Sequence, residues 1–281
     1  MSIKSPTISV IVSTYNQPDW LYKTLLGYQY QRFDSFEIII ADDGSDHRTK
    51  SVIEQFKTQT TIPIIHVWHE DRGFQKTTIL NKAILASNTD YLIFTDGDCI
   101  PRRDFVAVHH QKRTLHYFLS GGYFKLPKTI SDLITEQDIK TQACFDPKWL
   151  LNLGLKKTFK LHKLCSKGIK EKLLNKYTVT KATWNGMNSS AWKKDIMAVN
   201  GFDTRMQYGG EDRELGERLV NNKIKGLQIR YSAICVHLFH LRAYKNEAMI
   251  IANKNIRART KKEKIIKTPY GIETLKGAVK L

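Results

Sequence analysis

The fold is decided by the stretch Tyr91-Leu92-Ile93-Phe94-Thr95-Asp96-Gly97-Asp98-Cys99-Ile100-Pro101. Its aromatic and β-branched beginning, residues 91–94, is typical of a buried strand, and turn residues follow it. Asp96 and Asp98 therefore lie where the strand ends. Ligands of parallel α/β sheets bind at the carboxyl ends of strands, and two adjacent carboxylates favour a divalent cation that holds a diphosphate. A solvated Asp-Gly-Asp turn is the alternative, because any turn prefers these residues.

The residues before this stretch alternate between strand and helix patterns. Apolar runs predict buried strands at 8–13, 36–41 and 64–68, and helical spacing of apolar residues predicts helices at 20–30, 49–56 and 76–86. Four such β-units with helical crossovers predict an α/β fold with a mostly parallel, doubly wound central sheet flanked by helices. Neither a Gly-x-Gly-x-x-Gly motif nor a Walker loop follows the first strand, so side chains and a metal would have to hold the phosphates.

Beyond residue 101 the alternation becomes irregular. The pattern predicts a strand at 116–124 with a Gly-Gly break, a helix at 130–141, a site-lining strand at 184–188, a helix at 211–220 and a strand at 227–231. These elements predict a second, mixed half of the same domain.

Positive charge is concentrated in two segments of the chain. Residues 154–181 hold nine Lys against one Glu, and residues 254–281 hold nine Lys or Arg against two Glu, so these segments carry +15 of the net +18. Such surfaces attract acidic lipid headgroups, nucleic acid or a charged acceptor, and a solubilising face is the alternative. The first segment also contains candidates for a buried or lipid-facing side, namely Leu155, Phe159, Leu164, Ile169 and Leu173.

Compartment signals are few. The chain has no apolar run of the roughly 20 residues that cross a bilayer, and its beginning lacks a signal-peptide pattern, so a cytoplasmic location is expected. Four cysteines without Cys-x-x-Cys spacing argue against a zinc site and a disulfide framework. Free thiols are therefore expected.

Five motifs in one order resemble the inverting glycosyltransferases of family 2, which have the GT-A fold. They are Ser13–Asn16, Asp42–Ser45, Glu70–Phe74 followed by Leu80–Ala83, Asp96–Asp98, and Asn185–Leu219 with Gly201-Phe202-Asp203 and Gly209-Gly210-Glu211-Asp212. The last resembles the acceptor half of galactosyltransferases and of bacterial chondroitin-type polymerases. The resemblance covers roughly residues 6–242 and leaves out the two basic segments.

The resemblance implies a division of the chain. A GT-A glycosyltransferase domain is expected at 1–245, with a Rossmann-like nucleotide-sugar-binding half at 1–101 and a mixed acceptor half at 102–245. The acceptor half would contain a Lys-rich insertion at 154–181, and a basic C-terminal tail would follow at 246–281.

For the donor, the resemblance implies a nucleoside diphosphate sugar, with UDP as the first choice, and Mn²⁺ or Mg²⁺ as cofactor. Asp98 would ligate the metal, Asp96 would hold the ribose or reach the metal through water, and His237 matches the metal-binding histidine, with His240 as a second candidate. The remaining nucleotide-binding candidates are Asp43 for the base or ribose, and Thr14 and Asn16 beside the base.

For the acceptor, Asp212 would be the catalytic base, and Glu211 would hold an acceptor hydroxyl or shape the pocket. Asp rather than Asn at position 212 implies inversion of configuration. Favourable charge in the first turn of a helix is the alternative role for both acids. Trp184 and Tyr208 would form a stacking floor for a sugar ring, unless either belongs to the core.

The expected function is hexosyl or N-acetylhexosaminyl transfer to a glycan or lipid-linked glycan, in bacterial-type surface polysaccharide or lipopolysaccharide synthesis. The basic segments would dock the enzyme on the anionic inner face of the cell membrane. One alternative is a basic nucleic-acid- or polyanion-binding protein on an α/β scaffold, which the lack of a nucleic-acid motif disfavours. The other is a sugar nucleotidyltransferase, although no Gly-rich N-terminal phosphate loop is present.

Overall fold

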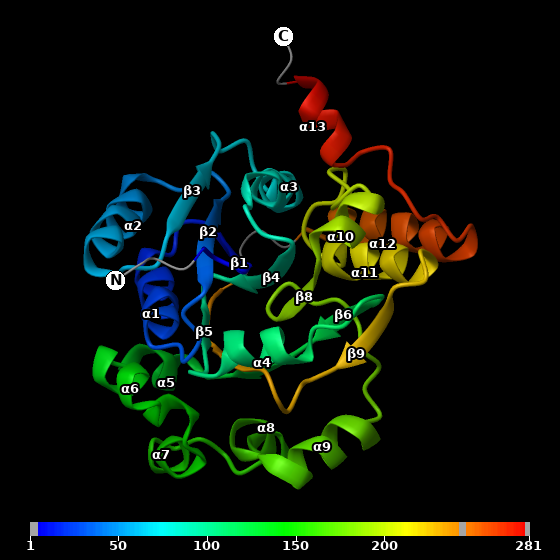
Figure 1. Ribbon diagram of the computed structural model, residues 1–281. Coiled ribbons are helices and arrows are strands. Elements are labelled where there is room, and N and C mark those ends of the chain that lie inside the picture. The colour runs from blue at the N-terminus through cyan, green and yellow to red at the C-terminus, as the bar shows by residue number, and fades with distance from the viewer. Residues whose placement is uncertain (1–4, 242–245, 279–281) are drawn as a thin grey trace.

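The computed structural model describes residues 5–241 and 246–278, with side chains described as far as residue 275. The expected boundary at 245 lies outside these residues. A seven-stranded sheet in the order β3-β2-β1-β4-β8-β6-β9 forms the centre, and helices cover it (Figure 1). The predicted α/β fold with a mostly parallel sheet is confirmed.

The amino-terminal half contains the parallel part of the sheet. Strands β1 (Ile8–Thr14), β2 (Phe36–Asp42), β3 (Ile64–Trp68) and β4 (Tyr91–Asp96) alternate with helices α1 (Pro18–Gln29), α2 (His47–Gln59) and α3 (Lys76–Ala86). The register pairs Ser13 with Asp96 and Thr14 with Asp42. These acids therefore meet at one edge of the sheet.

Both faces of β1 are buried, as parallel strands between helices require. Val10 and Val12 join one apolar cluster, and Ile11, which points the other way, joins a second cluster on the opposite face. The continuous apolar run of the sequence follows from this two-sided burial.

The second half adds antiparallel pairing. Strand β8 (Ser189–Trp192) runs antiparallel to β4 and to β6 (Tyr117–Ser120), and β9 (Lys225–Gln228) lies parallel to β6. A separate three-stranded sheet has the order β5-β10-β7, formed by β5 (Cys99–Pro101), β10 (Ile234–His237) and β7 (Gly122–Lys125). It brings Asp98 beside the residues that follow β10, because the Leu238 amide donates a hydrogen bond to the Asp98 carbonyl at 2.8 Å.

Several element predictions for this half were wrong in their bounds. Residues 184–188 form a turn before β8 rather than a strand, and the strand expected at 227–231 lies at Lys225–Gln228. The expected helix at 130–141 divides into α5 (Lys128–Leu133) and α6 (Glu136–Thr141). Thr135 and Asp138 form a capping box that starts the second helix, and this explains the break.

The remaining helices of this half surround the mixed part of the sheet. They are α4 (Phe105–Lys112), η1 (Ala143–Phe145), α7 (Pro147–Asn152), η2 (Phe159–Leu161), α8 (His162–Cys165), α9 (Gly168–Tyr177), α10 (Lys193–Ala198) and α11 (Glu211–Asn221). The Lys-rich segment 154–181 thus folds as short helices, which lie below the sheet in Figure 1.

The carboxyl-terminal segment is built into the domain where the structure describes it. Helix α12 (Glu247–Lys262) lies beside α11 (Figure 1), and α13 (Ile272–Ala278) follows. The Asn253 side chain donates to the carbonyls of Gln207 and Gly209. Within the segment expected as a basic tail at 246–281, residues of α12 thus hold the loop that leads into α11.

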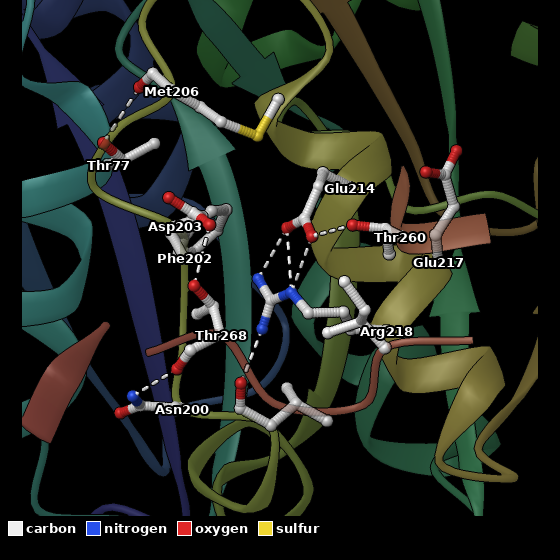
Figure 2. Close-up of polar contacts among 12 residues, drawn as sticks. Thr77, Asn200, Phe202, Asp203, Met206, Glu214, Glu217, Arg218, Thr260 and Thr268 are labelled. Carbon is white, nitrogen blue, oxygen red and sulfur yellow. Dashed lines mark hydrogen bonds and ion pairs between the residues drawn. The ribbon is translucent and has the colours of Figure 1, made fainter. Parts of the chain in front are cut away.

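A buried ion pair within α11 receives a hydrogen bond from α12 (Figure 2). Arg218 donates to Glu214 at 2.7–2.9 Å and to the Val199 carbonyl at 2.5 Å, and the side chains of the pair are 0% and 1% exposed. Thr260 of α12 donates to Glu214 at 2.9 Å. Buried charges are tolerated when they are paired and hydrogen-bonded, and this group meets both conditions.

Among the helices within the described ranges, none is both long and apolar enough to cross a membrane.

Candidate active site

A first cavity of about 410 Å³ opens at the carboxyl ends of β1 and β4. It is lined by residues 13–17, Asp43, Gly73, Phe74, Lys76, Ile79, residues 96–98, His240 and Leu241. Strands β2 and β3 lie on one side of β1, and β4 and the later strands lie on the other. In open α/β sheets, ligands bind where the strand order reverses in this way.

Asp96 is held at the floor of this cavity by two donors. The Ser13 hydroxyl and the Lys76 ammonium both donate to Asp96 Oδ1, each at 2.7 Å. Burial alone would raise the pKa of Asp96, but the charge and hydrogen bond of Lys76 and the bond from Ser13 outweigh it and leave this pKa below its usual value. Asp96 is therefore an ionised carboxylate.

Asp98 faces two imidazoles. His237 Nε2 lies 3.8 Å from Asp98 Oδ1, and His240 Nε2 lies 3.4 Å from Asp98 Oδ2. His237 Nδ1 lies 2.8 Å from the Leu238 carbonyl, which can only accept, so Nδ1 carries a proton and Nε2 is the ring nitrogen left to bind a metal. One carboxylate and two imidazoles form a donor set that suits Mn²⁺.

Cys99 completes this group by distance but not by chemistry. One ligand atom each from Asp98, Cys99 and His237 lies within 4.8 Å of the others. Burial, followed by the neighbouring Cys235, raises the pKa of the Cys99 thiol well above its usual value. Because sulfur is a soft ligand and Mn²⁺ prefers oxygen and imidazole nitrogen, Asp98 and His237 suit this ion better than Cys99 does.

Asp43 is fixed by the loop after β3. His69 Nε2 lies 2.8 Å from Asp43 Oδ1, and the Gln75 amide donates to Oδ2 at 3.0 Å. Asn16 has a left-handed backbone with φ of 48°, and its side-chain oxygen accepts from the Asp46 amide at 2.8 Å. Asp43, Asn16 and the buried Thr14 all line the first cavity, so the structure brings the predicted nucleotide-binding residues together.

A second cavity of about 230 Å³ lies at the start of α11. It is lined by Ser120, Gly121, Gly122, Tyr123, Lys163, Thr180, Lys181, Thr183, Trp184, Asn185, Met187, Gly210, Asp212, Arg213, Gln228 and Arg230. Asp212 belongs to this cavity, whereas Asp96 and Asp98 belong to the first.

The start of α11 is shaped by glycines. Gly209 and Gly210 have φ of 110° and 96°, a region that other residues rarely adopt, and α11 begins immediately after them. A Cβ on Gly186 would lie only 2.7 Å from Asp212 Oδ2. Glycines at these positions let the chain bring the Asp212 carboxylate against the 184–188 turn.

Both acids at the start of α11 have raised pKa values. Burial, followed by the charge of Asp212, raises the pKa of Glu211 to about 7. Burial raises the pKa of Asp212, and the charge of Asp96 adds to this effect while Lys76 works against it. Asp212 Oδ1 is buried and has no hydrogen-bond partner in the described part of the chain. It is a carboxylate suited to accept a proton.

Lys76 connects the two groups of acids. Burial would lower its pKa, but the carboxylates of Asp96, Asp212 and Glu211 outweigh this effect and raise it well above the usual value. Lys76 lines the first cavity and Asp212 lines the second. A single ammonium group therefore balances acids that serve both cavities.

The two residues predicted to stack on a sugar, Trp184 and Tyr208, have different surroundings. Trp184 is 0% exposed, and its ring packs against Phe94 and Phe118, so the ring belongs to the core and offers no face for stacking. That prediction is wrong for the ring, although the residue lines the second cavity. The Tyr208 ring contacts Phe74, a residue of the first cavity, edge-on at 6.0 Å.

Sequence reasoning missed Lys76 and His69. The signal for Lys76 was its position in the first turn of a helix, where the helix dipole disfavours a cation unless a carboxylate compensates it. His69 precedes the Glu70–Phe74 motif and carried no signal of its own, because its role depends on contact with Asp43.

Comparison with known proteins agrees with this geometry. The model of glycosyl transferase family 2 matches residues 9–112, and the model described as the N-terminal domain of galactosyltransferase matches residues 173–242. Together they contain both groups of acids. The chain therefore resembles the glycosyltransferases of family 2.

Curated relatives support this resemblance. The uncharacterized glycosyltransferase YfnE of Bacillus subtilis is 29% identical over 83% of this chain and 64% of its own length. Chondroitin synthase of Escherichia coli is 25% identical over 75% of this chain and 32% of its own length. The chain thus spans between about a third and two thirds of these relatives.

Solved structures show that the fold of this chain is GT-A. A mannosyltransferase of Pyrobaculum calidifontis superposes with a TM-score of 0.57 at 17% identity, over 85% of this chain and 59% of that one. GalNAc-T7 superposes with a TM-score of 0.60 at 14% identity, over 97% of this chain and 53% of that one. The predicted resemblance to family 2 and its GT-A fold is confirmed.

Proposed function

We propose that this chain transfers a sugar from a nucleoside diphosphate sugar, UDP-linked as the first choice, to a hydroxyl of a glycan with inversion. The observation that carries the proposal is the arrangement of acids around Lys76, with Asp96 and Asp98 in one cavity and Asp212 in the other. Complexes of similar folds support the donor class, since their titles name GDP-Man with Mn²⁺, UDP-GlcNAc, and UDP with Mn²⁺.

In the proposed reaction the acceptor hydroxyl oxygen attacks the anomeric carbon, and the bond from that carbon to the diphosphate oxygen breaks. The hydroxyl proton passes to Asp212 Oδ1, which has no partner among the described residues. The products are the glycoside and the nucleoside diphosphate. Burial supports this role of Asp212, because a raised pKa makes its carboxylate a stronger base.

Asp98 and His237, with His240 as a further candidate, would hold Mn²⁺ at the first cavity. A bound divalent cation supplies charge that stabilises the departing diphosphate. Lys76 keeps Asp96 ionised and contributes a second positive charge to the wall of the same cavity. Thr14, Asn16 and Asp43 are the proposed contacts for the nucleoside.

Binding of UDP measured calorimetrically with and without Mn²⁺ tests this proposal. We expect Mn²⁺-dependent binding in the wild type and a loss of about tenfold or more in Asp98→Asn, because a metal ligand is removed. Asp34→Asn is the matched control. Asp34 is an exposed carboxylate that precedes the amino-terminal end of β2, whereas the first cavity lies at the carboxyl ends of the strands. Binding that ignores Mn²⁺, or an unchanged affinity in Asp98→Asn, would contradict the proposed metal site.

We further propose contact with the anionic inner face of a cell membrane, as expected for an enzyme of surface polysaccharide or lipopolysaccharide synthesis that uses a lipid-linked acceptor. The Lys-rich segment presents Phe159, Ile169 and Tyr177, which are 66%, 78% and 69% exposed. No residue of α9 is buried. Apolar side chains among lysines are typical of surfaces that bind anionic membranes. Leu164, in contrast, is buried, which is the other of the two roles expected for these residues.

Sedimentation with phosphatidylserine-containing and neutral vesicles tests the membrane proposal. The double variant Phe159→Ser and Ile169→Ser should lose most of its binding to anionic vesicles. Val220→Ser, which removes an exposed apolar side chain from α11, should retain it. Equal sedimentation of the wild type with both kinds of vesicle would reject the membrane contact and leave the proposed chemistry untouched.

A further inference from the structure

The second cavity gathers polar atoms that lack partners. Asn185 Oδ1, Asp212 Oδ1 and Gln228 Oε1 are buried side-chain oxygens for which the described part of the chain supplies no hydrogen bond, and all three residues line this cavity. The amide orientations are fixed, because Asn185 Nδ2 donates to the Asn188 carbonyl and Gln228 Nε2 donates to the Thr180 carbonyl. Buried acceptors without donors indicate a ligand that carries donor groups, such as the hydroxyls of a sugar.

The same cavity is strongly basic. Lys163, Lys181, Arg213 and Arg230 line it, and Asp212 is its only acidic residue in the described lining. Neither Lys181 nor Arg213 has an ion-pair partner among the residues that the structure describes. Unpaired cations that converge on one cavity favour an anionic ligand.

Lys163 shows how close these charges lie. It is only 8% exposed, and its ammonium donates to the Tyr123 carbonyl at 3.1 Å. Burial, followed by the nearby charges of Arg230 and Lys160, lowers its pKa to about 8. An anion placed between Lys163 and Arg230 would relieve this repulsion, which gives the cavity a physical reason to bind one.

We propose that the second cavity is an acceptor site for an acidic sugar, whose hydroxyls donate to Asn185 and Gln228 while its carboxylate or phosphate lies among the four cations. The accepting hydroxyl would face Asp212. This inference rests on the proposed transfer reaction and adds to it the charge of the acceptor. It also assigns Lys163 and Lys181 of the Lys-rich segment to the cavity, apart from the exposed residues proposed to meet the membrane.

The test compares the affinities of three probes by NMR titration of the full chain. They are methyl β-D-glucuronide for a carboxylate, glucose 6-phosphate for a phosphate, and methyl β-D-glucoside as the neutral match. Either the glucuronide or glucose 6-phosphate should bind about tenfold or more tightly than the neutral glucoside, because hydrogen bonds to charged groups contribute strongly. The probe that binds more tightly shows whether the preferred anion is a carboxylate or a phosphate. Arg230→Gln should abolish the preference, whereas Lys172→Gln, an exposed change on α9 outside the lining, should keep it.

Equal affinities for the three probes, including the absence of detectable binding, would overturn this inference, as would a preference that survives in Arg230→Gln. Circular dichroism and Mn²⁺-dependent UDP binding of Arg230→Gln confirm that the variant is folded and that the first cavity is intact. Failure of UDP binding in the wild type would instead count against the proposed function, so the two failures are distinguishable.

Discussion

Replacing Arg218 with methionine removes the cation from an ion pair whose side chains are 0% and 1% exposed. The change deletes the three contacts from Arg218 to Glu214 and its bond to the Val199 carbonyl. Among the residues that the structure describes, it leaves only Thr260 as a side-chain donor to Glu214. Removing one partner of a buried pair costs about 3–5 kcal/mol, because the other charge stays buried without compensation. We therefore expect Arg218→Met to lower the free energy of unfolding by about 3–5 kcal/mol.

A matched control lies on the neighbouring helix. Arg259 and Glu263 have the same four-residue spacing in reverse order, but they are 66% and 49% exposed, so Arg259→Met should cost about 0.5 kcal/mol or less. The double variant Glu214→Gln and Arg218→Met should recover part of the loss, because it removes both charges. Urea unfolding followed by circular dichroism measures all three values. A loss in Arg218→Met no larger than that in Arg259→Met would refute the reasoning.

Two further predictions concern the site. In Lys76→Met the pKa of Asp212 should rise further, because the ammonium that lowers it is gone. Since the base must be ionised to act, the acid limb of the pH–rate profile of sugar transfer should move to higher pH. An unmoved limb would count against the proposed balance of charges. In Gly186→Ala the added Cβ would lie 2.7 Å from Asp212 Oδ2. Turnover should therefore fall roughly tenfold or more while the affinity for UDP stays constant. Equal losses of turnover and UDP affinity would show that the substitution disturbs both cavities.

The strands of the amino-terminal half could be predicted from the sequence because each strand shows its burial in its own run of residues. The strands at 8–14, 36–42 and 91–96 are buried on both faces, and this produces continuous apolar runs, of which the second and third end in acids. Parallel topology then brings those ends to one edge, so Asp43, Asp96 and Asp98 could be grouped before the structure was seen.

The second half resisted prediction because its strands are short and its contacts are distant in sequence. Strand β5 has three residues, too few for a period, and the 184–188 turn mixes apolar and amide residues as an edge strand would. Trp184 has the same sequence signal whether it stacks on a ligand or packs in the core. Only the packing of Phe94 and Phe118 against it decides that question.

The basic segments show the limit of charge counting. Arg257 and Lys261 appear in the sequence as part of a charged tail, but in the structure both pair with Glu217 of α11, at 2.5 and 3.3 Å. Lys163 and Lys181 count equally as surface lysines until the fold brings them to the cavity that contains Asp212. Pairing across the fold, and not composition, gives these charges their roles.

The central claim is that the first cavity holds the donor while Asp212 acts as the base from the second. Asp212→Asn keeps the shape of the side chain and removes its basicity, so turnover of the UDP-sugar donor with its acceptor should fall by about 10²–10⁴-fold. The same variant should bind UDP and Mn²⁺ as the wild type does, because Asp212 does not line the first cavity. Wild-type turnover in Asp212→Asn, or a loss of UDP binding that accompanies the loss of turnover, would contradict the account.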